Sequence, residues 1–205
     1  MRYFIRLISC VLLLLSLPAF AAPDTAPSVK KAEEYLRDLG TAQARFLQTA
    51  SDGSQYIGTF YLDRPGKLRF EYDDPIEDFV VADGFFIYFY DAELEEQTNA
   101  PIGQTLADFL LRADLKLSGD VTVTNVERKG GLLQVTLTQT GDTNAGSLTL
   151  GFDEKPFALK KWRVTDPQGA VTEVELFQLQ TGIHIDSALF TYQGPKEKHP
   201  FRVNN

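Results

Sequence analysis

The chain has 205 residues, with 28 acidic and 20 basic side chains and a net charge of −8. Nucleic acids and anionic membrane surfaces bind proteins through basic patches, so this acidic balance argues against both as partners. The length and the hydrophobic fraction of 43% allow one domain with its own core. The only cysteine, Cys10, lies in an N-terminal segment that we expect to be removed, so the mature core must be stable without disulfides.

Residues 1–21 have the features of a secretory signal peptide. Two arginines precede an apolar run at residues 7–17, and Ala19-Phe20-Ala21 fits a cleavage site, with cleavage after Ala21. The apolar run is shorter than the ~20 residues that span a membrane. It also continues beyond Cys10, whereas the cysteine of a lipoprotein signal follows the apolar run.

The expected mature chain, residues 22–205, forms a single domain. It loses the two signal arginines and no acidic residue, so its net charge falls to −10. A signal peptide with this kind of cleavage site is typical of a bacterial periplasmic protein, and full secretion is the open alternative. We expect no stable insertion into a membrane.

The first structured element is predicted to be one amphipathic helix. Ser28 can cap its start, and Gly40 supplies a stop. Apolar residues recur between these two at helical spacing, while charged residues lie off this stripe. The stripe consists of Val29, Ala32, Leu36 and Leu39.

From Thr41 the hydrophobic period changes to two, which is typical of strands. The turn at residues 64–67 separates two strands, and Leu68, Phe70 and Tyr72 alternate with charged residues along the second. Residues 85–90 contain five aromatics in six positions, so we expect this strand to lie between two apolar layers.

A second helical stretch is predicted at residues 104–112, with Leu106, Phe109 and Leu110 on one side. Alternation resumes after Gly119 and continues through residues 188–192. About eleven short strands joined by hairpin turns predict an antiparallel meander.

The predicted fold class is mainly β (α+β), with a single curved antiparallel sheet that forms an unclosed half-barrel. Twisted sheets of this length curl, and an open curl exposes its concave apolar face. The two helices are the elements that can cover it, as a helical lid over an apolar cavity. The lid residues are predicted to be Leu36, Leu39, Leu106, Phe109 and Leu110.

The cavity itself is predicted from aromatic and aliphatic side chains on the inner face of the sheet. Pattern alone favours a packed core over a ligand cavity, because most buried aromatics serve packing. For Arg64 the pattern alone likewise favours an ordinary turn cation. The candidate cavity residues are Phe46, Phe60, Leu68, Phe70, Tyr72, Phe86 and Tyr88.

The sequence lacks the patterns of catalytic, metal or cofactor sites. His184 and His199 lie fifteen positions apart with no cysteine near them. The acidic run at residues 73–78 lacks the spacing of a calcium loop, and no Gly-x-Ser-x-Gly segment is present. We therefore predict that the protein is not an enzyme and needs no cofactor or metal.

An ordered set of segments resembles the LolA family of periplasmic outer-membrane lipoprotein carriers. The segment from Gly58 to Tyr72, Gly-Thr-Phe-Tyr-Leu-Asp-Arg-Pro-Gly-Lys-Leu-Arg-Phe-Glu-Tyr, carries most of the resemblance. Nearly the whole mature chain is covered, in order. The other matching segments are residues 45–49, 81–84, 87–91, 166–172 and 189–195.

The resemblance implies an unclosed barrel with a helical lid and a function in lipoprotein transfer. The arginine before proline, here Arg64, would hold the lid closed by hydrogen bonds to lid backbone. The apolar residues after it, here Leu68 and Phe70, would face the cavity, although relatives often carry Phe and Trp there. This difference and the short polar tail at residues 196–205 bear on cavity shape and receptor docking.

The partners that the resemblance implies are acylated lipoproteins, an inner-membrane lipoprotein-releasing ABC transporter and an outer-membrane lipoprotein receptor. We expect a monomer. The alternative is a periplasmic lipoprotein- or lipid-sensing module of the same half-barrel fold. A lipid hydrolase is disfavoured because no catalytic group is recognisable.

Overall fold

The computed structural model describes residues 25–104 and 109–194. The predicted signal peptide, Leu106 and the C-terminal tail lie outside the described residues. The described chain forms eleven strands: β1 (Thr41–Thr49), β2 (Gln55–Asp63), β3 (Lys67–Tyr72), β4 (Phe79–Asp83), β5 (Phe86–Asp91), β6 (Glu96–Pro101), β7 (Val121–Lys129), β8 (Leu132–Gln139), β9 (Ser147–Glu154), β10 (Phe157–Thr165) and β11 (Val171–Thr181).

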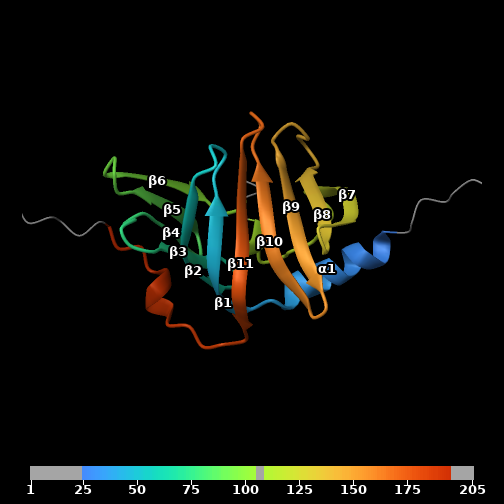
Figure 1. The fold of residues 1–205 in the computed structure, drawn as a ribbon, viewed down its shortest axis with the longest axis horizontal. Helices are drawn as coiled ribbons and strands as arrows, with labels where there is room; N and C mark the ends of the chain where they lie inside the picture. Colours follow the sequence, from blue (N-terminus) through green and yellow to red (C-terminus); the bar gives the residue numbers. More distant parts are fainter. Residues whose placement is uncertain (1–24, 105–108, 195–205) are drawn as a thin grey trace, which may run out of the picture.

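All eleven strands belong to one curved antiparallel sheet, which is unclosed, as Figure 1 shows. This confirms the predicted fold class. The strand order is β6-β5-β4-β3-β2-β1-β11-β10-β9-β8-β7, so two meanders meet where β1 pairs with β11. The consecutive strands β6 and β7 therefore lie at opposite edges of the sheet. The chain between them, residues 102–120, must cross from one edge to the other and is called the crossing segment below.

Helix α1 (Ala26–Asp38) begins earlier than predicted. Thr25 is the N-cap, so the assignment of this role to Ser28 is wrong. Pro27 lies in the first turn, where its fixed φ and missing N–H suit a helix start. The helix ends as predicted just before Gly40, and the N–H of Leu39 donates to the carbonyl of Tyr35 at 3.0 Å.

The prediction of a second amphipathic helix is wrong for the described residues of the crossing segment. They contain only a 3₁₀ turn, η1 (Phe109–Leu111), and all three of its side chains are buried. An amphipathic helix needs one polar face, whereas this turn is apolar all round. The carbonyls of Leu111 and Arg112 accept from the N–H of Gly66 and from the Arg64 side chain in the β2–β3 turn.

The predicted strand at residues 188–192 is also wrong, because the chain there forms a second 3₁₀ turn, η2 (Ser187–Phe190). The carboxylate of Asp186 accepts from the N–H of Ala188 at 2.9 Å and caps this turn. The turn contacts β3 and β4 on the outer side of the sheet. Within the described residues, no helix has the length and apolar character needed to cross a bilayer.

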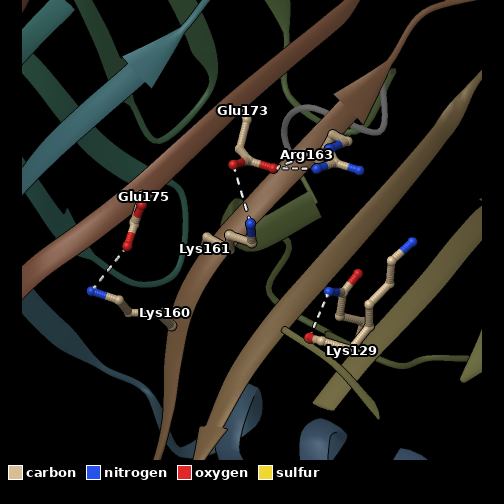
Figure 2. Close-up of polar contacts among 7 residues, drawn as sticks. Lys129, Lys160, Lys161, Arg163, Glu173 and Glu175 are labelled. Atoms are coloured by element: carbon tan, nitrogen blue, oxygen red, sulfur yellow. Dashed lines mark hydrogen bonds and ion pairs between the residues drawn. The ribbon is translucent and has the colours of Figure 1, made fainter. Parts of the chain in front are cut away.

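The convex face of the sheet is marked by partly exposed ion pairs between β10 and β11 (Figure 2). Glu173 pairs with Lys161 at 3.1 Å and with Arg163 at 2.6 Å. Lys160 lies 3.3 Å from Glu175. Exposed pairs contribute only ~0–1 kcal/mol each, so their main value is to identify the side of these strands that faces solvent.

The concave face carries the core. Trp162 and Val174, a cross-strand pair on β10 and β11, are both buried. Helix α1 lies across one end of this face, near β8 and β9 (Figure 1). Its Tyr35 ring packs edge-on against Phe152 and Phe157, with centroid distances of 5.9 and 5.7 Å. The helix therefore closes one end of the half-barrel.

Candidate functional site

The concave face encloses a cavity of about 350 Å³. Both meanders contribute to its wall, and η1 forms part of its cover. None of the described lining residues is charged. The described residues that line the cavity are Gln48, Phe60, Leu62, Leu68, Phe70, Tyr72, Val80, Ile87, Phe89, Phe109, Leu110, Leu148, Leu150, Trp162, Val164, Thr172 and Val174.

Four of the predicted cavity residues lie in this wall: Phe60, Leu68, Phe70 and Tyr72. Phe46 does not line the cavity but lies directly behind it, 1% exposed. Its ring packs edge-on against Phe70 and Tyr72, with centroids 5.0 and 5.3 Å apart. Phe46 therefore packs against two residues of the cavity wall, Phe70 and Tyr72, without lining the cavity.

The assignment of Phe86 and Tyr88 to the cavity is wrong. They lie on the other face of β5, where Tyr88 stacks on Tyr192 with centroids 4.4 Å apart and Phe86 is 40% exposed. Ile87 and Phe89 line the cavity instead. Because side chains alternate along a strand, a shift of one residue exchanges its two faces. A strand with large apolar side chains on both faces gives no pattern from which to predict the face that lines the cavity.

The expectation that this aromatic strand is buried between two layers is wrong as well. Strand β5 lies next to the edge strand β6, and Phe89 is 44% exposed although it lines the cavity. The outer face of β5 is covered only in part, by the segment around η2, where Tyr192 stacks on Tyr88. Phe89 therefore borders the open side of the cavity.

The second meander supplies cavity residues that the sequence interpretation did not select. Trp162 packs against Phe60 and Phe70 with centroids 5.6 and 6.1 Å apart. Leu148 and Leu150 come from β9 and complete that side. Their alternating pattern marks them as inward-facing, but the sequence does not show that the two meanders share one cavity.

Gly58 makes the packing behind the cavity possible. A Cβ at this position would lie 2.2 Å from the carbonyl oxygen of Glu71 and 2.7 Å from the ring of Phe46. Real Cβ atoms do not approach that closely. The missing side chain therefore leaves room for the Phe46 ring over β2, next to Phe70 and Tyr72 of β3.

Arg64 joins the helix and the crossing segment to the sheet. Its Nη1 donates to the carbonyls of Leu36 and Leu39 in and after α1, the second at 3.3 Å. Its Nη2 donates to the carbonyl of Arg112 at 2.8 Å, just after η1. One guanidinium thus bonds the backbone of both elements that cover the cavity, and the fork geometry of arginine suits such divergent contacts.

The Arg64 guanidinium is half-buried, and burial lowers its pKa because the charged form loses hydration. No carboxylate pairs with it in the described part of the chain. Among the described residues, the partners of the Arg64 guanidinium are backbone carbonyls.

The predicted lid residues that the structure describes are all buried. Leu36 and Leu39 pack into the core at the end of α1, whereas Phe109 and Leu110 line the cavity. A further contact joins the two covering elements. The carboxylate of Glu33 in α1 accepts from the N–H of Leu117 in the crossing segment at 2.8 Å.

A second, larger hollow of about 710 Å³ lies on the convex side, between β3–β5 and the segment around η2. Its lining includes Arg69, Glu77 and Asp186. Charged walls suit water better than hydrocarbon, so the smaller apolar cavity is the better candidate for an apolar ligand. The described residues contain no group of three His, Cys, Asp or Glu side chains that could hold a metal.

Comparison with known proteins agrees with this architecture. A family model described as "Outer membrane lipoprotein carrier protein LolA" matches residues 37–193. The chain belongs to this LolA family. The resemblance seen in the sequence is thereby confirmed.

Relatives of the LolA family cover most of the chain. An outer-membrane lipoprotein carrier protein of Methylococcus capsulatus is 28% identical over 86% of this chain and 88% of its own length. Those of Legionella pneumophila strain Paris and Azotobacter vinelandii are each 30% identical, over 82% and 90% of this chain and 87% and 94% of their own lengths. The solved structure of a LolA superfamily protein from Nitrosomonas europaea has a TM-score of 0.44 and 12% identity, over 83% of this chain and 99% of that chain.

Proposed function

We propose that this protein is a periplasmic carrier that binds the acyl anchor of lipoproteins in the concave cavity. It would receive them from an inner-membrane ABC transporter and deliver them to an outer-membrane lipoprotein receptor. The observation that carries the proposal is an uncharged cavity whose two covering elements are bonded by one arginine, in a chain of the LolA family.

The physical need for such a carrier is the cost of hydrocarbon in water. Each exposed methylene group costs ~0.8 kcal/mol, so an anchor with two or three acyl chains costs on the order of tens of kcal/mol. A soluble carrier must therefore offer an enclosed apolar surface. The aromatic and aliphatic wall around Phe70 and Trp162 has that character.

The cavity must enlarge when it is loaded. Sites for drug-sized ligands measure roughly 300–1,000 Å³, and about 350 Å³ lies near the lower limit. An anchor with several chains is larger than such a ligand. Loading would therefore displace α1 and the crossing segment and break the hydrogen bonds of Arg64, with the energy supplied by the transporter.

Substitution in the cavity wall tests the proposal. Phe70→Glu should lower the amount of triacylated lipopeptide that co-elutes with the protein at least tenfold, because an unpaired carboxylate in an apolar site costs several kcal/mol. Phe89→Glu, at the partly exposed border of the cavity, should show the same loss at less risk to folding.

Phe86→Glu is the matched control, since it makes the same change on the opposite face of β5 and should bind the lipopeptide like the wild type. Circular dichroism would establish that each variant is folded. Wild-type binding by folded Phe70→Glu and Phe89→Glu would show that the ligand does not enter this cavity.

A further inference from the structure

The polar side chains of the cavity gather at one end. Gln48, the Tyr72 hydroxyl and Thr172 lie among apolar lining residues, and the indole N–H of Trp162 is the other polar group of the wall. Tyr72 donates to the Oε1 of Gln48 at 2.9 Å. Gln48 pairs in register with Val174, so Thr172 is its diagonal neighbour on the same face of β11.

This polar end lies far from Arg64. Gln48 is seven residues along β1 from Thr41, which pairs with Asp63 beside the Arg64 turn. At ~3.4 Å per residue, the two ends of the cavity wall are about 24 Å apart along the strand. Phe109 and Leu110 cover the end near Arg64, since the adjacent carbonyl of Leu111 accepts from Gly66 in that turn.

The donors at the polar end have no protein partner. Neither the amide NH₂ of Gln48 nor the hydroxyl of Thr172 bonds to another described residue, while Oε1 of Gln48 is already used by Tyr72. The site therefore offers unpaired donors among apolar lining residues. Burial raises the pKa of Tyr72 to about 12, so its hydroxyl stays neutral and keeps donating at neutral pH.

A negative charge lies near this end of the cavity, because Asp78 interacts electrostatically with Tyr72. Asp73, the next residue along the chain, faces the convex side and is paired there with Arg45. An anionic head group placed at the polar end would lie near Asp78, and none of the described lining residues is a cation that could bind it, which disfavours such a ligand.

We propose that Gln48, with Tyr72 and Thr172, binds the ester or amide carbonyl oxygens at the head of a neutral acylated ligand and rejects anionic phospholipids. A carbonyl oxygen is an acceptor without a proton, so it matches unpaired donors. The acyl chains would then enter toward Phe109, with the head left at the open end. This inference rests on the proposed function, because it assigns a subsite in the same cavity.

The test compares soluble short-chain ligands by the fluorescence of Trp162, which is the only tryptophan of the chain and lines the cavity. Dihexanoylglycerol carries two ester carbonyls. The corresponding dihexyl ether glycerol has the same number of chains and the same hydroxyl but no carbonyl. Dihexanoyl phosphatidate keeps both esters and adds a negative head group.

We expect the wild type to bind the ester about fivefold to tenfold more tightly than the ether, which corresponds to one or two hydrogen bonds. The phosphatidate should bind at least tenfold more weakly than the ester. Gln48→Leu should reduce the ester-to-ether ratio to about one. Tyr72→Phe, which keeps the ring, should reduce the ratio by a smaller factor.

Equal binding of ester and ether by the wild type would overturn the subsite and leave the carrier proposal standing. An unchanged ratio in Gln48→Leu would also overturn it, as would phosphatidate binding as tight as ester binding. If neither neutral ligand alters Trp162 fluorescence and neither displaces a bound lipopeptide, both the subsite and the cavity's role in binding are wrong.

Discussion

Arg64 bonds the backbone of both elements that cover the cavity. It donates to three carbonyls from two separate segments, and its charge has no carboxylate partner among the described residues. Hydrogen bonds of a charged donor contribute ~1.5–3 kcal/mol each at best, and partial exposure reduces this. In the proposed loading step α1 and the crossing segment move away and these bonds are lost, so they would favour the closed, empty state.

Arg64→Leu should therefore let cargo load but hinder its delivery. Removing bonds that exist only in the closed state shifts the equilibrium toward the open, loaded state. We expect transfer of bound lipoprotein to outer-membrane vesicles to slow at least tenfold, measured as the lipoprotein left in the soluble fraction over time.

Arg163→Leu is a suitable control, because Arg163 is partly exposed and pairs with Glu173 on the convex face of the sheet. It should deliver cargo like the wild type. Normal delivery by Arg64→Leu would refute the role of Arg64 in holding the cover closed, whether or not the cavity binds the acyl anchor.

The sequence identifies some of these residues and misses others for physical reasons. The sequence identifies Arg64, Leu68 and Phe70 because the turn signal at residues 64–67 and the alternating pattern after it both predict the same hairpin. The prediction assigns Phe86 and Tyr88 to the wrong face because β5 carries aromatic or aliphatic residues on both of its faces. The hydrogen bond between Tyr72 and Gln48 joins residues 24 positions apart, and no local pattern predicts such a pair.

At the scale of elements, α1 and the crossing segment behave as one cover. The helix contributes Glu33, whose carboxylate accepts from the N–H of Leu117 at 2.8 Å. Leu115 and Leu117 are themselves buried in the core. The two elements are thus joined to each other as well as to Arg64, so we expect them to move together when the cavity opens.

Glu33→Ala should loosen the crossing segment without unfolding the sheet. The Leu117 amide loses its acceptor, and loss of ~1–2 kcal/mol predicts roughly tenfold faster hydrogen exchange at that amide. Glu34→Ala is the control, because Glu34 makes only an exposed pair with Lys30 at 3.8 Å. Unchanged exchange at Leu117 would show that the contact does not hold the two elements together.

Elements differ in how well the sequence predicts them. Alternation identifies strands and, for most of them, the buried face, because the period of side chains in a strand is two. It does not identify pairing partners, so the contact between β1 and β11 emerges only from the structure. The crossing segment is wrongly predicted to contain an amphipathic helix, because the apolar side chains of η1 are buried on all sides and not on one face.

At the scale of the whole molecule, a continuous sheet forms the wall of the cavity, and its cover comes from α1 and the crossing segment, which lie outside the sheet. Every strand is hydrogen-bonded into one sheet, and the two edges belong to β6 and β7. The crossing segment joins these edges and packs η1 against the concave face. The cover can therefore be displaced without breaking strand pairing, as a carrier that loads and unloads requires.

The most direct test of carrier function is release of lipoproteins from membranes. The purified protein would be added to spheroplasts that contain the cognate transporter and newly made lipoproteins. We predict that lipoproteins appear in the soluble fraction in a one-to-one complex with the protein, and that release requires ATP inside the spheroplasts. Failure to release any lipoprotein under these conditions would contradict the account and favour a module that senses lipoproteins or lipids without transporting them.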